Sequence, residues 1–261
     1  MTLRFGCMGG SRWALRLGLA LAVAIPISAT NAPACSVTLG YGQWPPYQTT
    51  DSNGEAAGLD IEMVRAIAKQ ASCSVTFVDA PFKRILRDIR EGDLDAMVGY
   101  FKEARTEFGQ YTEPYRADTK ALYVRQGLDG NIRNLESFFK AGYHLGIVRS
   151  VFYGADAMRL IENPEFADQI EVITENPLNL RKLLAGRLDG SIVNPPHVAV
   201  FLHANNAVGK IDRRNIVFQT NMHMIFSKAT VDKAVVDAFN QAIEELSQDG
   251  ALAAIIKRYE E

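Results

Sequence analysis

The sequence predicts an α/β protein with two lobes, each a mostly parallel sheet flanked by helices. From Cys35 onward, apolar strand-like runs alternate with helical segments, which favours parallel pairing with right-handed crossovers. The stretch GRLDGSIV (186–193) repeats the pattern of GDLDAMVG (92–99): a turn, Leu-Asp, an apolar strand and a loop. This repetition predicts two similar lobes whose strand ends face one crevice.

The first lobe begins with a predicted strand at 36–40 and a loop that Pro45 and Pro46 keep out of regular structure. The segments that follow are a helix at 58–70, a strand at 74–78, a helix from Pro81 to Arg90 and a strand at 94–98. This order predicts a parallel sheet that two crossover helices cover.

The second lobe repeats the alternation. Its predicted strands are 119–125, 143–148, 170–173 and 188–193, and its helices are 135–140, 155–162, 179–186 and 196–204. Strands at 216–219 and 223–227 and helices at 231–248 and 251–259 then return the chain to the first lobe. We therefore expect lobe 1 to comprise residues 35–118 and 222–261 and lobe 2 to comprise residues 119–221, with hinge closure around a ligand.

Residues 1–34 have the pattern of a secretory signal peptide. Three arginines precede an apolar run at 17–27, and Ala32-Pro33-Ala34 provides an A-x-A cleavage signal. The apolar run is well short of the roughly 20 residues that a membrane-spanning helix needs. We therefore expect cleavage, export to the periplasm and no direct membrane insertion of the mature chain.

The charge balance argues against two classes of partner. The loss of three arginines with residues 1–34 leaves 25 basic and 30 acidic residues, a net charge of −5. The chain has no basic block and no basic helix face, which argues against nucleic acid and against an anionic membrane surface as partners. We expect a monomer that binds a small molecule.

Cys35 and Cys73 open two similar segments, Cys-Ser-Val-Thr-Leu and Cys-Ser-Val-Thr-Phe. If these strands lie parallel and side by side, their first residues are neighbours, and an oxidising compartment favours a disulfide. Such a bond would stabilise the fold by about 4 kcal/mol in the chain-entropy model. The alternative is lipid attachment at Cys35 directly after cleavage. We favour the disulfide, because Ala32 and Pro33 fit a lipoprotein cleavage motif poorly and lipidation would leave Cys73 without a partner.

Several motifs follow one another in a specific order along the chain. They are Trp44-Pro-Pro-Tyr47, Gly58-Leu-Asp60, Gly92-Asp-Leu-Asp95, Arg105 with Tyr111-Thr-Glu-Pro-Tyr115, Gly186-Arg-Leu-Asp189, and Gln248-Asp-Gly250 with Tyr259. Together they resemble the periplasmic solute-binding proteins of the polar amino-acid uptake family, the bacterial extracellular solute-binding proteins of family 3. The resemblance implies a two-lobed type II periplasmic-binding-protein fold. It also implies capture of a small carboxylate-bearing ligand, an amino acid or amino-acid-like compound, for delivery to an ABC-type membrane permease.

The resemblance implies ligand-binding roles for particular residues. Arg105 matches the family arginine that grips a ligand carboxylate, to which the guanidinium fork is well suited, and the alternative is a surface arginine. Trp44 and Tyr47 match aromatic positions that stack on the ligand, although they can instead pack the first lobe. Phe82 matches an apolar pocket position, and a core phenylalanine at a helix start is the alternative.

The chain also departs from the family pattern. Tyr100 and Lys102 stand where amino-acid binders carry hydroxyl residues, and Asn194 stands where they carry a carboxylate for the ammonium group of the ligand. A neutral amide cannot neutralise a buried cation. Arg149 either adds a second anion contact or caps a turn. Together these departures predict an anionic or amide-bearing ligand rather than a standard zwitterionic α-amino acid.

The sequence predicts no catalytic residue, no metal site and no cofactor. The four histidines are scattered, and there is no phosphate-binding glycine loop or G-x-S-x-G elbow. Two alternatives to transport stay open. The same fold serves periplasmic dehydratases of cyclic carboxylic acids, for which Glu103 and Asp95 are the candidate acids, although the recurring Leu-Asp motif suits a structural role for Asp95 better. A binding protein of this kind can also act as a ligand sensor for a membrane receptor.

Overall fold

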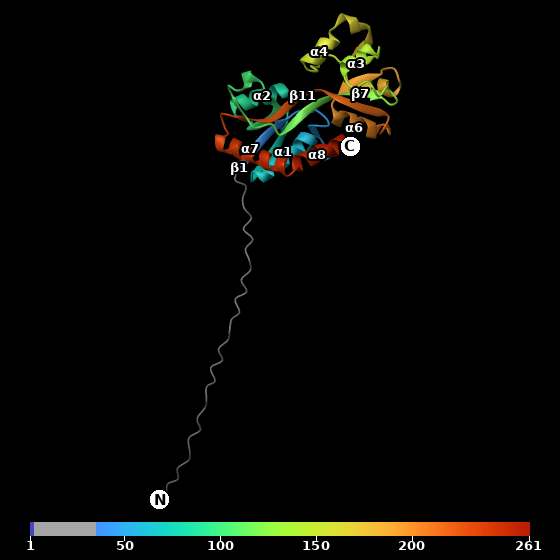
Figure 1. Cartoon of the computed structure of the whole chain (residues 1–261). Helices are drawn as coiled ribbons and strands as arrows, with labels where there is room; N and C mark the ends of the chain where they lie inside the picture. Colours follow the sequence, from blue (N-terminus) through green and yellow to red (C-terminus); the bar gives the residue numbers. More distant parts are fainter. Residues whose placement is uncertain (3–34) are drawn as a thin grey trace. The chain divides into compact units, whose positions relative to one another are not determined.

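The central sheet determines where a binding site can form. The structure, a computed structural model, describes residues 1–2 and 35–261 (Figure 1). Its main sheet has the strand order β4 (Cys73–Asp79), β1 (Cys35–Tyr41), β5 (Ala96–Tyr100), β11 (Ile211–Ser227), β7 (Arg116–Arg125), β10 (Gly190–Val193), β8 (Leu145–Val148) and β9 (Ile170–Ile173), with β6 (Gly109–Tyr111) paired to β11. A small separate sheet consists of β2 (Thr49–Thr50) and β3 (Ala56–Ala57).

Parallel pairing dominates on both flanks of this sheet. β1 pairs in parallel with β4 and β5, and β8 pairs in parallel with β9 and β10, whereas β11 runs antiparallel to β5 and β7. We call β4, β1, β5 and β6 the β1 side, and β10, β8 and β9 the β10 side. The helices are α1 (Leu59–Gln70), α2 (Phe82–Glu91), α3 (Leu135–Lys140), α4 (Ala155–Ile161), α5 (Asn176–Leu184), α6 (Pro195–Ala204), α7 (Lys233–Gln248) and α8 (Ala251–Glu260), with 3-10 turns η1 (Glu103–Arg105) and η2 (Pro164–Gln169). The predicted α/β class is confirmed.

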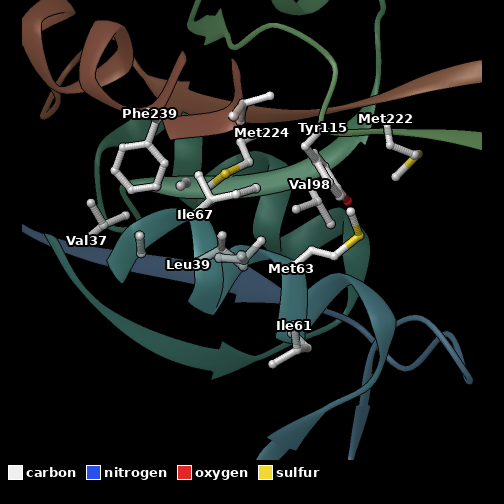
Figure 2. Packing of buried hydrophobic residues seen from close by; sticks show 14 of the residues in the cluster. Val37, Leu39, Ile61, Met63, Ile67, Val98, Tyr115, Met222, Met224 and Phe239 are labelled. Atoms are coloured by element: carbon white, nitrogen blue, oxygen red, sulfur yellow. The ribbon is translucent and has the colours of Figure 1, made fainter. Parts of the chain in front are cut away.

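Strand β5 carries apolar side chains on both faces, so hydrophobic cores form on each face of the β1 side. Ala96 and Val98 belong to a core that α1, α7 and α8 complete, and Figure 2 shows Val98 there beside residues of α1 and β11. Met97, between them, points to the opposite face and packs with Ile85 and Ile89 of α2. The strand is therefore buried from both faces, as its continuous apolar run indicates.

The β10 side is built in the same way. Leu122 of β7 joins a core with Phe138 of α3, whereas its neighbour Tyr123 joins a core with Leu180 of α5 on the other face. The consecutive residues of β7 alternate between the two cores because side chains in a strand alternate in direction. Strands β7 and β11 thus extend through both sides of the molecule and connect them.

The repeated Leu-Asp motif has one structural role on both sides. Asp95 accepts hydrogen bonds from the backbone N–H and the hydroxyl of Thr38 in β1, at 2.8 and 2.7 Å. Asp189 accepts one from the backbone N–H of His144, just before β8, at 2.9 Å. Each aspartate therefore ties the start of its own strand to the strand beside it.

The predicted disulfide is confirmed. Cys35 and Cys73 are opposite each other in the parallel register of β1 and β4, with their Cα atoms 4.6 Å apart, and they are joined by a disulfide.

Replacing both cysteines by serine should lower the free energy of unfolding by about 4 kcal/mol, because the unfolded chain regains the entropy that the cross-link removes. The two residues are 38 positions apart, which sets the size of the loop. Urea denaturation of the wild type and the double variant measures the difference. Equal free energies of unfolding would show that the bond adds nothing to stability.

The strand that ends at Ser227 differs from its prediction. Two strands were expected at 216–219 and 223–227, but β11 is continuous from Ile211. The polar residues Thr220 and Asn221 lie between the two expected strands, and their backbones pair with Asp118 and Ala117 of β7. A polar stretch continues a strand when its backbone stays paired and its side chains are partly exposed.

The predicted lobe boundaries, 118/119 and 221/222, fall inside β7 and β11, and this assignment of residues to the two lobes stays a prediction. The predicted signal peptide lies outside the described residues, apart from positions 1 and 2. Across the described parts of the chain, no helix has the length and apolar character that crossing a membrane requires.

Candidate functional site

A pocket of about 430 Å³ opens at the carboxyl ends of β1 and β5. This is where ligands bind in open α/β sheets. Its lining comes from the ends of these strands, the loop after β1, the first turn of α2, η1 and β11. The residues that line it are Gly40, Gly42, Gln43, Trp44, Gln48, Pro81, Phe82, Ile85, Met97, Val98, Gly99, Tyr100, Arg105 and Met222.

Arg105 is the only charged side chain in this lining. Its Nη1 donates a hydrogen bond to the backbone oxygen of Tyr100 at 3.2 Å, and its guanidinium carbon lies 5.4 Å from the ring centre of Phe82. Gly99 makes room for it, because a Cβ there would lie 3.3 Å from Nη1. Among the described residues, no carboxylate forms a salt bridge with Arg105. The pocket therefore has a net positive charge.

Helix α2 adds to this positive potential. Pro81 and Phe82, at its N-terminus, line the pocket, and its first turn contains no acidic residue. The N-terminus of a helix carries a partial positive charge and backbone N–H groups that favour anions. Arg105 and the helix end therefore both favour an anionic group in the pocket.

Aromatic side chains form much of the remaining wall. Trp44 and Tyr100 meet edge to face, with ring centres 6.5 Å apart. Phe82 is 50% exposed, so part of its ring is accessible to a ligand. A ligand with a flat or apolar body would cover this surface.

A buried ionic cluster lies beside the pocket and was not predicted. It consists of Asp60, Arg116, Asp118 and Lys120. Arg116 donates to Asp60 from Nε at 2.6 Å and from Nη2 at 3.2 Å, and Lys120 Nζ lies 3.2 Å from Asp118 Oδ2. Both carboxylates are fully buried. Arg116, Asp118 and Lys120 alternate along β7, which places them on one face of the strand.

Two of the residues predicted to contact the ligand, Tyr100 and Asn194, form hydrogen bonds with this cluster. The Tyr100 hydroxyl donates to Asp118 Oδ2 at 3.0 Å, and Asn194 Nδ2 donates to Asp118 Oδ1 at 3.0 Å. Burial and the nearby Asp118 carboxylate raise the pKa of Tyr100, so the hydroxyl keeps its proton and remains a donor. The ring of Tyr100 still lines the pocket.

Four of the seven predicted ligand contacts, Trp44, Phe82, Tyr100 and Arg105, line the pocket. The other three, Tyr47, Arg149 and Asn194, do not. Tyr47 is buried, with the Arg116 guanidinium carbon 4.5 Å from its ring centre. Arg149 is exposed in the loop after β8. The ligand-binding roles of all seven stay predictions.

His197 connects α6 to the loop after β1. Its ring lies 5.4 Å from the ring of Tyr47, and its buried Nδ1 has no hydrogen-bond partner among the described residues. Burial lowers the pKa of His197 below its ordinary value of 6.5, although the nearby Asp118 opposes this and Lys120 reinforces it. The folded protein therefore resists protonation of His197 more than the unfolded chain does.

Acidification should destabilise the fold through His197. The unfolded chain binds a proton at His197 from about pH 6.5 downward, whereas the folded chain does so only at lower pH, so the free energy of unfolding falls over this interval. Replacing His197 by asparagine should reduce the loss of stability between about pH 7 and about pH 5. Urea denaturation at both values measures the loss, with His203→Asn, at an exposed histidine, as the control. An equal loss in the wild type and the His197→Asn variant would disprove this.

One group of acidic residues has carboxylate oxygens close enough together to coordinate a metal ion. Carboxylate oxygens of Asp88, Glu91 and Asp93 lie within 4.8 Å of one another. Asp88 already pairs with Arg84 and Arg87, and the hydrogen bond from Arg87 helps to lower the pKa of Asp88. The ion pairs with two arginines explain this group without a metal.

Known proteins resemble this chain over most of its length. Residues 37–261 match the model of the family described as bacterial extracellular solute-binding proteins, family 3. A probable histidine-binding protein of Neisseria gonorrhoeae is 23% identical over 220 residues, which cover 83% of this chain and 80% of that protein. The lysine/arginine/ornithine-binding periplasmic protein of Escherichia coli (strain K12) is 22% identical over 265 residues, covering 93% and 95%.

A solved structure shows the same fold. The second substrate-binding domain of GlnP from Lactococcus lactis, in an open conformation, aligns with a TM-score of 0.70 at 16% identity, covering 86% of this chain and 94% of that domain. At this identity the likeness concerns the fold alone. It confirms the predicted type II periplasmic-binding-protein fold.

Proposed function

The chain belongs to the bacterial extracellular solute-binding proteins, family 3, and from this membership we propose that it captures a small carboxylate-bearing ligand beside Arg105. One observation carries the proposal: Arg105 is the only charge in the lining of a largely apolar and aromatic pocket. Among the described residues, the Arg105 side chain makes one hydrogen bond, from Nη1 to the backbone oxygen of Tyr100, which leaves the other nitrogens of the guanidinium available to a ligand. A guanidinium and a carboxylate form two parallel, charge-assisted hydrogen bonds, and these are stronger in a partly desolvated pocket.

The rest of the ligand is proposed to be apolar or aromatic, without a free ammonium group. Trp44, Phe82 and Tyr100 supply flat surfaces for stacking. The lining contains no carboxylate to receive an ammonium group, and Asp118, the nearest buried carboxylate to Tyr100, already accepts from four donors. The relatives are named for binding histidine or lysine, arginine and ornithine. We propose that this chain differs from these relatives because it binds an amino-acid-like carboxylic acid that has no free ammonium group.

We further propose that the β10 side closes over the pocket and that the closed protein delivers its ligand to an ABC-type permease in the periplasm. Support for closure comes from β7 and β11, the two strands that connect the sides, and from Arg149 in the exposed loop after β8. Support for transport comes from relatives named as periplasmic binding proteins. The role is binding and not catalysis, and the protein acts as a monomer.

A panel of matched compounds tests the carboxylate requirement. Hydrocinnamate and hexanoate, each with its primary amide and its α-amino acid (phenylalanine and norleucine), are added to the purified protein, and thermal unfolding is recorded. Hydrocinnamate and hexanoate should raise the unfolding temperature of the protein, because a ligand that binds only the folded state stabilises that state. The amides should not, since they cannot form the ionic pair with Arg105. Equal shifts with acids and amides would remove the basis for a carboxylate ligand.

A further inference from the structure

Lys120 provides the cation for a buried carboxylate next to the pocket. Its Nζ lies 3.2 Å from Asp118 Oδ2, and the Tyr100 hydroxyl donates to the same oxygen at 3.0 Å. Tyr100 lines the pocket, so this oxygen contacts both the pocket wall and the lysine. Asp118 is fully buried, and a buried carboxylate without a nearby cation is strongly unfavourable.

Arg116 does not replace Lys120 in this role. Its Nε and Nη2 bind the two oxygens of Asp60, at 2.6 and 3.2 Å, and only Nη1 reaches Asp118, at the longer distance of 3.4 Å. The guanidinium is therefore committed to Asp60. This leaves Lys120 as the main cation for Asp118, and the cluster of two carboxylates and two cations is neutral as a whole.

Lys120 is also the member of the cluster that reaches solvent. Its side chain is 13% exposed, whereas that of Arg116 is 1% exposed. The ring centre of Phe218 lies 5.4 Å from Nζ, which holds the ammonium group between an aromatic face and the carboxylate. Removal of the lysine side chain would open a passage from solvent to Asp118.

A single residue relates this cation to Arg105. The backbone oxygen of Tyr100 accepts from Arg105, and its hydroxyl donates to Asp118. A ligand that places its carboxylate on Arg105 and lies along Tyr100 therefore extends toward the Asp118–Lys120 pair. A zwitterionic ligand bound in this way would bring its ammonium group toward Lys120, which already neutralises the Asp118 carboxylate. The ligand and lysine ammonium groups carry like charges, and these repel each other in a partly buried site.

We propose that the Lys120 ammonium group occupies, from within the chain, the cation site that this pocket would otherwise offer to a ligand amine. The protein thereby selects acids that lack an α-ammonium group. The selection rests on the proposed binding of a carboxylate at Arg105, whereas the cation site itself rests only on the geometry of Asp118 and Lys120.

The first test compares two ligands of one skeleton. Calorimetric titration gives the dissociation constants of hydrocinnamate and of phenylalanine for the wild type and for the Lys120→Ala variant. The wild type should favour hydrocinnamate, and the variant should shift the affinity ratio toward phenylalanine by about tenfold or more, because the ligand ammonium group then pairs with Asp118. An unchanged ratio in a variant that still binds hydrocinnamate would overturn the selection by Lys120. Absence of hydrocinnamate binding in the wild type would count against the proposed function instead.

The second test does not depend on any ligand at Arg105. Propylammonium chloride replaces the missing end of the lysine side chain, so it should raise the thermal unfolding temperature of Lys120→Ala above that in sodium chloride. Where the variant is unfolded in sodium chloride, propylammonium should restore the folded signal. The matched control is the double variant Asp118→Asn/Lys120→Ala, which lacks the carboxylate and should not respond. If propylammonium shifted the unfolding temperatures of the wild type, the single variant and the double variant equally, the proposal that Lys120 occupies a cation site at Asp118 would be overturned.

Discussion

Replacing Arg105 by alanine should weaken carboxylate binding by about 100-fold or more, because it removes both charge-assisted hydrogen bonds and the only cation in the lining. The fold should stay intact, since Arg105 is only half-buried and the one hydrogen bond that its side chain makes to the described residues goes to the backbone oxygen of Tyr100. Calorimetric titration with the tightest-binding carboxylate of the panel measures the change, and the thermal unfolding temperature checks the fold.

Two further arginine variants make this result specific. Arg105→Lys keeps the charge but loses the planar fork, so its affinity should fall between those of the wild type and Arg105→Ala. Arg84→Ala removes an exposed arginine of α2 that does not line the pocket, and its affinity should equal that of the wild type. If Arg84→Ala and Arg105→Ala weakened binding equally, a general change in surface charge would explain both.

Replacing Arg116 by methionine should lower the free energy of unfolding by about 3–5 kcal/mol. The side chain is 1% exposed, and it neutralises the fully buried Asp60, which also accepts hydrogen bonds from Tyr115 and Gln48. Methionine fills similar space but leaves the Asp60 carboxylate buried without a cation. Urea denaturation measures the loss.

Arg125→Met is the matched control, because Arg125 ends the same strand and also pairs with an aspartate, Asp189. This arginine is 42% exposed, so its removal should cost no more than about 1 kcal/mol. Similar losses in the two variants would show that burial of the Asp60–Arg116 pair makes no difference to stability.

Local patterns were sufficient to predict most of the fold. The paired Cys-Ser-Val-Thr segments indicated two adjacent parallel strands in register, and the structure pairs Cys35 with Cys73 as expected. The apolar run at 94–98 predicted a strand, and β5 (Ala96–Tyr100) lies there. These features depend on side-chain periodicity within short segments, which the sequence displays directly.

Features that depend on distant residues were not predicted. Asp60 and Arg116 are 56 positions apart, and only the folded chain brings the start of α1 next to the start of β7. Their one visible signal was the alternation of Arg116, Asp118 and Lys120 within a strand, where charged residues on one face require partners. The family resemblance matched Tyr47, like Trp44, to a ligand-stacking position, and packing places its ring against the Arg116 guanidinium, outside the pocket lining, so its ligand role stays a prediction.

The identity of the bound compound tests the central claim most directly. The protein is purified without unfolding and then denatured, and mass spectrometry identifies the small molecule that is released. The pocket around Arg105 predicts an acid with a carboxylate, an apolar or aromatic body and no free amino group. Release of a standard α-amino acid, or of a compound without any carboxylate, would contradict the account.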